Sequence, residues 1–170
     1  MKKFSSQIAA LTGACVLISA LAAGPALAEH FDIQLRVNGA QRQTQASMDT
    51  TPPIGGLNPR PLLKIKLGNI IKVDWRVRNS SPHGTLKGVT VHLFVVKQEK
   101  TGQKPVPDPA GSAGIFDNSF TTNLVLGATA NGAMKLTLTE PGSYLVRLQS
   151  EGTHDDAGHE HFAAIDVEVQ

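Results

Sequence analysis

The chain has 170 residues, with 16 lysines and arginines against 14 aspartates and glutamates, which gives a formal net charge of +2. Lys2 and Lys3 account for this excess, so the remainder is nearly neutral. That balance argues against nucleic acid or an anionic membrane surface as a partner. Cys15 is the single cysteine, which excludes a framework of internal disulfides.

The first 28 residues have the pattern of a secretory signal peptide. Lys2 and Lys3 form a basic start, Ile8 to Ala23 is mostly apolar, and Ala26-Leu27-Ala28 has the small-x-small form of a cleavage site. We therefore expect cleavage near Ala28 and a periplasmic or secreted protein, with Cys15 removed. Residues 29–170 are long enough for one domain with its own core. They hold no apolar run near the roughly 18 residues of a membrane span.

Short segments of alternating apolar and polar residues recur along this domain, separated by turn-forming residues. Their spacing is typical of an all-β sandwich or barrel. The expected strands are Phe31–Val37, Leu62–Leu67, Ile70–Arg78, Gly88–Val96, Phe116–Leu126, Met134–Thr139, Tyr144–Leu148 and Phe162–Val169. Asn38-Gly39 predicts a hairpin turn, and the proline-rich and glycine-rich segments Thr44–Pro61 and Glu99–Ala113 are expected to be long loops.

The connection between the last two strands is rich in possible metal ligands. His154, His159 and His161 lie there beside Asp155, Asp156 and Glu160. Histidine is the commonest protein ligand for metals, and two histidines two residues apart in an extended segment point the same way. This pattern predicts a metal site in the closing loop. The alternative is an acidic, histidine-containing loop that is simply solvated.

Three stretches together resemble the cupredoxins, a family of copper-binding Greek-key β-sandwiches. The first runs from Ile71 through Trp75 and Asn79 to Pro82-His83, the second is Leu138 to Tyr144, and the third is Gly158 to Phe162. The resemblance implies an all-β, cupredoxin-like Greek-key β-sandwich of about eight strands. It also implies copper as the cofactor, with His83 and His159 in ligand positions.

The sequence departs from the family at two ligand positions. Leu148 stands near the place of the copper-ligating cysteine, and Phe162 stands in the place of the axial methionine. Without a thiolate, a blue copper centre and electron transfer through it are not expected. His92, inside an apolar strand, is a rival to His83 for the first ligand position. An imidazole site suits Cu(II), and Zn(II) less selectively.

Three functions remain open. The first is an exported protein that handles metal through a thiolate-free histidine cluster, with His83, His92, His154, His159 and His161 as candidate ligands. The second is a metal-free sandwich that uses its long loops to contact another exported protein. The third is a type-2 copper enzyme, which would need an open coordination position at the ion.

Overall fold

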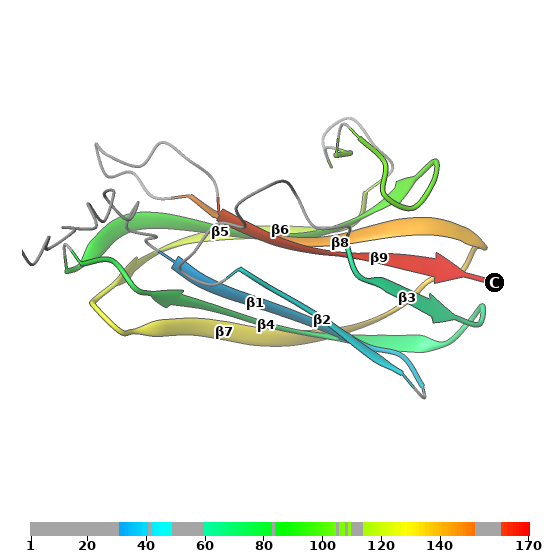
Figure 1. Cartoon of the computed structure of the whole chain (residues 1–170), viewed down its shortest axis with the longest axis horizontal. Helices are drawn as coiled ribbons and strands as arrows, with labels where there is room; N and C mark the ends of the chain where they lie inside the picture. The colour runs from blue at the N-terminus through cyan, green and yellow to red at the C-terminus, as the bar shows by residue number, and fades with distance from the viewer. Residues whose placement is uncertain are drawn as a thin grey trace, which may run out of the picture.

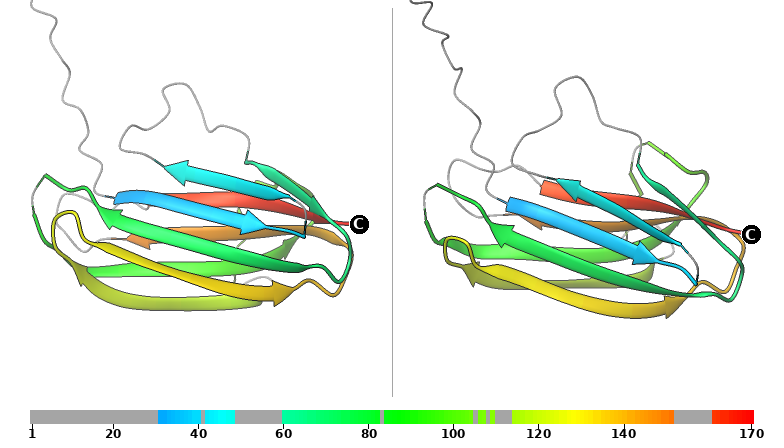
Figure 2. Two further views of the ribbon diagram at one scale, coloured as in Figure 1. Left: turned by 90° about the horizontal axis from the view of Figure 1, so that it is seen from below. Right: turned by 60° about the horizontal axis from the view of Figure 1, so that its bottom comes forward.

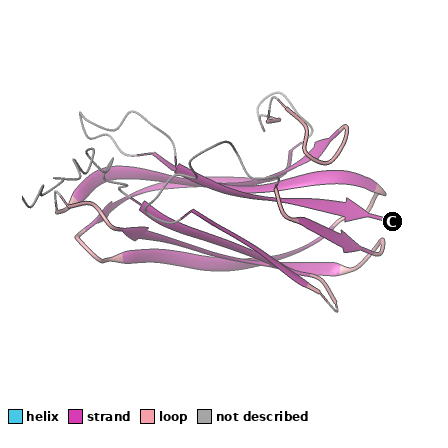
Figure 3. Cartoon of the chain, in the orientation of Figure 1, coloured by secondary structure: helices cyan, strands magenta, loops and turns pink. Residues whose placement is uncertain are grey.

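The computed structural model describes residues 31–40, 42–48, 60–82, 84–104, 106–107, 109, 114–151 and 161–170. These residues form nine β-strands in two sheets, which face each other as the layers of a sandwich (Figure 1). Figure 3 shows strands and loops only, and no helix within the described ranges has the length and apolar character to cross a membrane. The predicted all-β sandwich is confirmed, with nine strands rather than about eight.

The strands are regular and mostly six to thirteen residues long. They are β1 (Phe31–Asn38), β2 (Gln43–Met48), β3 (Leu62–Ile65), β4 (Ile70–Asn79), β5 (Leu86–Gln98), β6 (Gly114–Leu124), β7 (Thr129–Thr137), β8 (Gly142–Glu151) and β9 (His161–Val169). The predicted strand around Gly88–Val96 is β5, which lies between β8 and β6 and is the longest of the nine.

One sheet has the strand order β2-β1-β4-β7 and the other has the order β3-β9-β8-β5-β6. The pairs are antiparallel except for β3 and β9, which run parallel. After β6 the chain crosses to the facing sheet to form β7, and β8 then returns to lie beside β5. The four strands β5 to β8 thus follow the order of a Greek key.

The core lies between the sheets because each strand turns alternate side chains inward. In β1, the inward residues Ile33, Leu35 and Val37 are fully buried, whereas Gln34 and Arg36 between them are only partly covered. Opposite them, Val146 and Ile165 of the other sheet are also fully buried. Burial of such side chains stabilises a fold by about 1.5–3 kcal/mol each, so this layer dominates stability.

Two strands include residues that were not expected to be strand. The segment Thr44–Pro61 was predicted to be a loop, but its start belongs to β2, which pairs with β1 beyond the hairpin turn at Gly39. β7 begins at Thr129, five residues before the expected start of that strand at Met134. Both strands are weakly apolar, and pairing of the backbone with a neighbour decides their conformation.

Candidate metal centre

The connections that carry the candidate ligands leave from one end of the sandwich, at the left of Figure 1. There β4 ends at Asn79 and β5 begins at Leu86, so the connection between them holds position 83. At the same end β8 stops at residue 151 and β9 begins at His161. Phe31 lies between the end of β4 and the start of β9, because it pairs with Asn79 and its ring contacts His161.

Three of the five candidate ligands, His83, His154 and His159, lie outside the described residues. The strand ends on either side of them are described, and those ends lie close together. The topology therefore allows these three histidines to come from two connections at one end of the sandwich.

His161 is the first residue of β9 rather than part of the loop, and its side chain is fully buried. The imidazole meets the ring of Phe31 edge to face, with 5.2 Å between centroids and 73° between planes. In the strand register it lies opposite Ser150, which is buried as well. His161 thus packs against the core at the start of β9.

His92 lies on the outer surface of the same sheet. Its Nε2 is 2.6 Å from Oδ1 of Asp117 on β6, and its ring centroid is 4.9 Å from that of Phe94. An ionised carboxylate only accepts hydrogen bonds, so Nε2 carries the proton and donates it to Asp117.

The register separates His92 from His161. His92 pairs with Gln149 of β8, whereas His161 pairs with the next residue, Ser150. Successive residues of a strand face opposite sides of a sheet, so the two imidazoles lie on opposite faces. The expectation that His92 could join His161 at one ion does not fit this arrangement. Among the described residues, no group of three or more metal-binding side chains occurs.

Asn79 holds the connection that carries position 83. Its Nδ2 donates to the carbonyl oxygens of Gly84 at 2.6 Å and Leu124 at 2.8 Å, and its Oδ1 accepts from the backbone N–H of Ser81 at 2.8 Å. The Asn79 side chain is fully buried. One amide therefore ties the β4–β5 connection to the end of β6. The sequence had marked this residue only through the cupredoxin resemblance.

The two residues that the cupredoxin resemblance sets at the thiolate and axial positions lie on opposite faces of their sheet. Leu148, near the place of the family's thiolate, is fully buried in the core between the sheets. Phe162 faces the outer surface, where the guanidinium carbon of Arg147 lies 4.1 Å from the centre of its ring. Phe162 and His161 therefore face opposite sides of the sheet, and Phe162 contributes a stacking contact.

A buried charged cluster on the outer surface of β9 was not predicted from the sequence. Oδ1 of Asp166 accepts from Nε of Arg60 at 2.9 Å and from Nε2 of Gln98 at 2.8 Å, and its Oδ2 accepts from the backbone N–H of Gly102 at 2.8 Å. The Asp166 side chain is only 3% exposed. Arg60 also donates to the carbonyl oxygen of Gln103. These partners come from segments far apart in the sequence, which hides the cluster from local patterns.

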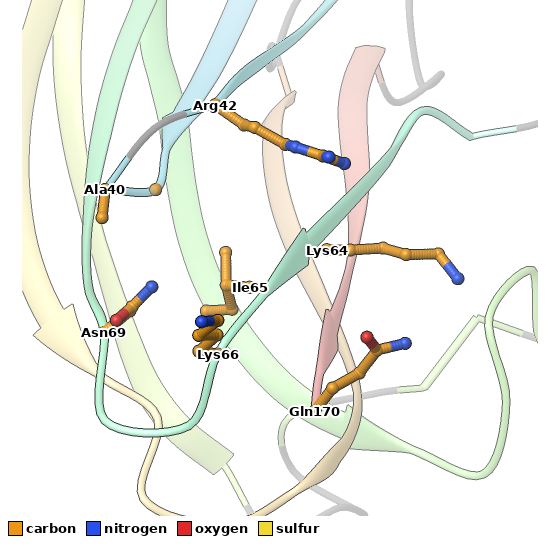
Figure 4. Close-up of a pocket in the computed structure, with 8 residues that line it drawn as sticks. Ala40, Arg42, Lys64, Ile65, Lys66, Asn69 and Gln170 are labelled. Carbon is orange, nitrogen blue, oxygen red and sulfur yellow. The ribbon is translucent and has the colours of Figure 1, made fainter.

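A surface hollow of about 490 Å³ opens beside β3 (Figure 4). It lies between the β1–β2 turn, β3 and the last residue of the chain. Its lining is cationic and amide-bearing, from Gly39, Ala40, Arg42, Lys64, Ile65, Lys66, Asn69 and Gln170. It contains no histidine or carboxylate side chain, so it is separate from the candidate metal centre.

The comparisons with known proteins give structural likeness only. No family model matches the chain, and no curated protein matches its sequence. One similar structure is the CARDB domain of a Pyrococcus furiosus protein in complex with di-metal ions, at 12% identity and a TM-score of 0.43, covering 84% of this chain and 91% of that one. A second is the C-terminal domain of Wzt, at 8% identity and a TM-score of 0.42, covering 80% and 70%.

A third similar structure is a family 123 glycoside hydrolase from Clostridium perfringens. It is 12% identical, with a TM-score of 0.40, and the match covers 69% of this chain but only 24% of the hydrolase.

Proposed function

We propose that this chain is an exported metal-binding protein that handles copper through histidines at one end of its sandwich. The observation that carries the proposal is the convergence of strand ends there. The ring of Phe31 links the end of β4, from which the connection with His83 leaves, to the start of β9, before which His154 and His159 lie.

The ligands in this proposal are His83, His154 and His159, whereas His161 is a buried residue of β9. Neutral imidazole suits Cu(II) above the other divalent metals of its row, with Zn(II) as the natural competitor. The absence of cysteine from residues 29–170 makes the site thiolate-free, which favours binding and delivery of the ion over blue-copper electron transfer. Asn79 would position the first ligand by fixing the residues on either side of it.

The test is a Cu(II) titration of the purified protein, followed by electron paramagnetic resonance and repeated with Zn(II). The wild type is expected to bind one equivalent with nitrogen hyperfine splitting. A His154→Ala, His159→Ala double variant removes two ligands. Loss of a group that only supports a ligand lowers metal affinity roughly 10- to 100-fold, so the copper affinity of this variant should fall by more than that. His161 is left intact because its replacement would open the core.

The matched control is His92→Ala, which removes an imidazole from the outer face where Asp117 already engages it. This variant should keep the affinity and the spectrum of the wild type. Binding that is weak, or that survives in the double variant, would contradict the proposal.

A second function, contact with another exported protein through the two long loops, has an observation of its own in its favour. Arg60, at the end of the first loop, and Gly102, in the second, both bind Asp166. Arg60 and Gly102 are thus anchored at the outer surface of β9, on a rigid support of the kind that binding loops use. The same titration separates the two functions, because a protein that binds its partner through loops is not expected to bind one equivalent of metal.

A further inference from the structure

The strand β6 differs from the other edge strands of the sandwich. Among the described strands, β6 ends one sheet and β7 ends the other at the same margin of the molecule (Figure 2). β6 has eleven residues, against four in β3, six in β2 and nine in β7. Like the shorter β2, it contains no lysine, arginine or proline, whereas β3 and β7 each carry a lysine. Lysine and proline are the usual means of preventing edge strands from pairing.

The side chains of β6 are unusually exposed for a strand of this length. Leu124, at its end, is its only buried residue, although its partner strand β5 is largely buried. Phe120 is 38% exposed, and its ring contacts Trp75 of the facing sheet at 5.8 Å between centroids. Asn118 lies opposite the buried Leu93 and is itself exposed. The inner face of β6 is therefore open along this margin.

The charge on β6 does not oppose pairing. Its one ionisable residue, Asp117, already contacts His92 of the neighbouring strand at 2.6 Å. The stretch from Phe116 to Thr122 pairs with β5 without a register shift, so its other edge presents a regular ladder of backbone groups. Such an edge is a template for one more strand.

We propose that β6 pairs with β6 of a second copy of this chain, antiparallel and about a two-fold axis at Asn118. This register sets Phe116 of each copy opposite Phe120 of the other, on the inner face. Cross-strand aromatic pairs of this kind stabilise a sheet. It also sets Asp117 opposite Ser119, so the two carboxylates do not face each other.

A shift of the axis by one residue in either direction loses these pairings. A shift of the axis by one residue toward the start of the strand would place Asp117 opposite Asp117. A shift the other way would place each phenylalanine opposite a polar residue, Thr122 or Asn118. The product of the proposed register is a continuous sheet of ten strands across two copies, with the isologous symmetry typical of homodimers. The margin lies along the side of the sandwich, so pairing leaves the histidine end uncovered.

The experiment measures the mass of the exported protein, residues 29–170, by sedimentation velocity at up to about 100 µM. Charge-swapped variants are made at the two-fold position. Asn118→Lys places two ammonium groups opposite each other, and Asn118→Glu places two carboxylates there. Each variant alone should dimerise about a hundredfold more weakly than the wild type. An equal mixture of the two should regain the dimer, because every mixed pair then joins opposite charges.

Asn118→Gln is the matched control and should leave dimerisation unchanged. Circular dichroism of each variant checks that the sandwich is folded. Recovery of the dimer on mixing is a second check of folding, because only folded variants could pair. A wild type that stays monomeric over the whole range, or single variants that dimerise as the wild type does, would overturn the proposal. So would a mixture that remains monomeric.

Discussion

The sandwich buries polar groups at two places, and the two clusters are built differently. At the histidine end, the neutral amide of Asn79 holds two carbonyl oxygens and one backbone N–H. Toward the other end, the carboxylate of Asp166 holds a guanidinium, an amide and a backbone N–H. Both groups are almost completely buried, so the difference lies in charge.

The two clusters should therefore differ in the free energy of unfolding that is lost when one partner is removed. A buried neutral group that loses its partners leaves a few unsatisfied polar atoms, each costing about 1–3 kcal/mol. A buried charge that loses its counter-ion costs about 3–5 kcal/mol. We therefore expect the Asp166 cluster to matter more for stability, and the Asn79 cluster to matter more for the candidate metal centre beside it.

The largest effect is expected from Asp166→Ala. Removal of the carboxylate leaves Arg60, whose side chain is 13% exposed, without its counter-ion. The free energy of unfolding in urea should fall by about 3 kcal/mol or more. Asp166→Asn keeps one acceptor oxygen and should lose less. Glu168→Gln, on the same strand but in the exposed pair with Lys64, is the control and should change stability little. Equal losses in the alanine variant and this control would show that the cluster is not a charged anchor.

A smaller loss, of about 2 kcal/mol, is expected from Asn79→Ala, because three hydrogen bonds to backbone groups disappear without a lost charge. Urea unfolding measures this loss, with the exposed Asn131→Ala on β7 as control.

In the copper titration, Asn79→Ala should also weaken binding, because the connection with His83 is no longer fixed. Asp166→Ala should bind copper as the wild type does while it remains folded. Weakened copper binding in Asp166→Ala, together with unchanged binding in Asn79→Ala, would disprove that the Asn79 cluster supports the metal centre and the Asp166 cluster supports stability.

Much of the fold follows from local sequence patterns. The alternation in Phe31–Val37 predicts β1, and the short, β-branched apolar run Gly88–Val96 predicts β5. β2 was missed because Thr44 and Ala46, its inward residues, carry too weak an apolar signal, and pairing with β1 fixes its conformation.

The candidate site could be predicted only in part, because orientation depends on register. The cluster of histidines near residue 160 is visible in the sequence, and so is its place between two strands. That His161 faces the core and His92 faces outward follows from how β8 pairs with its two neighbours. The Asp166 cluster depends on segments about 40 to 106 residues apart that only the folded chain brings together.

The smallest effect is expected at an exposed ion pair. It tests whether burial, rather than charge alone, explains the large contribution of the Asp166 cluster to stability. Lys97 and Glu140 form an exposed ion pair at 2.6 Å. The hydrogen bond from Lys97, and then its charge, lower the pKa of Glu140 below its ordinary 4.5, and the same hydrogen bond raises the pKa of Lys97 above 10.5. A lowered carboxyl pKa stabilises the fold above 4.5, and this contribution is lost as the pH falls through the folded pKa. A raised lysine pKa stabilises it below 10.5, and this contribution is lost as the pH rises through the folded pKa.

Glu140→Gln should therefore lower the urea midpoint only slightly at neutral pH, and the difference from the wild type should shrink at both acid and alkaline pH. It should also shrink in 1 M salt, because solvent and ions screen an exposed pair. Asp166→Ala should keep most of its loss in the same salt, since its carboxylate is buried. If salt removed both differences equally, the contrast between the buried and exposed pairs would fail, and charge alone would explain both.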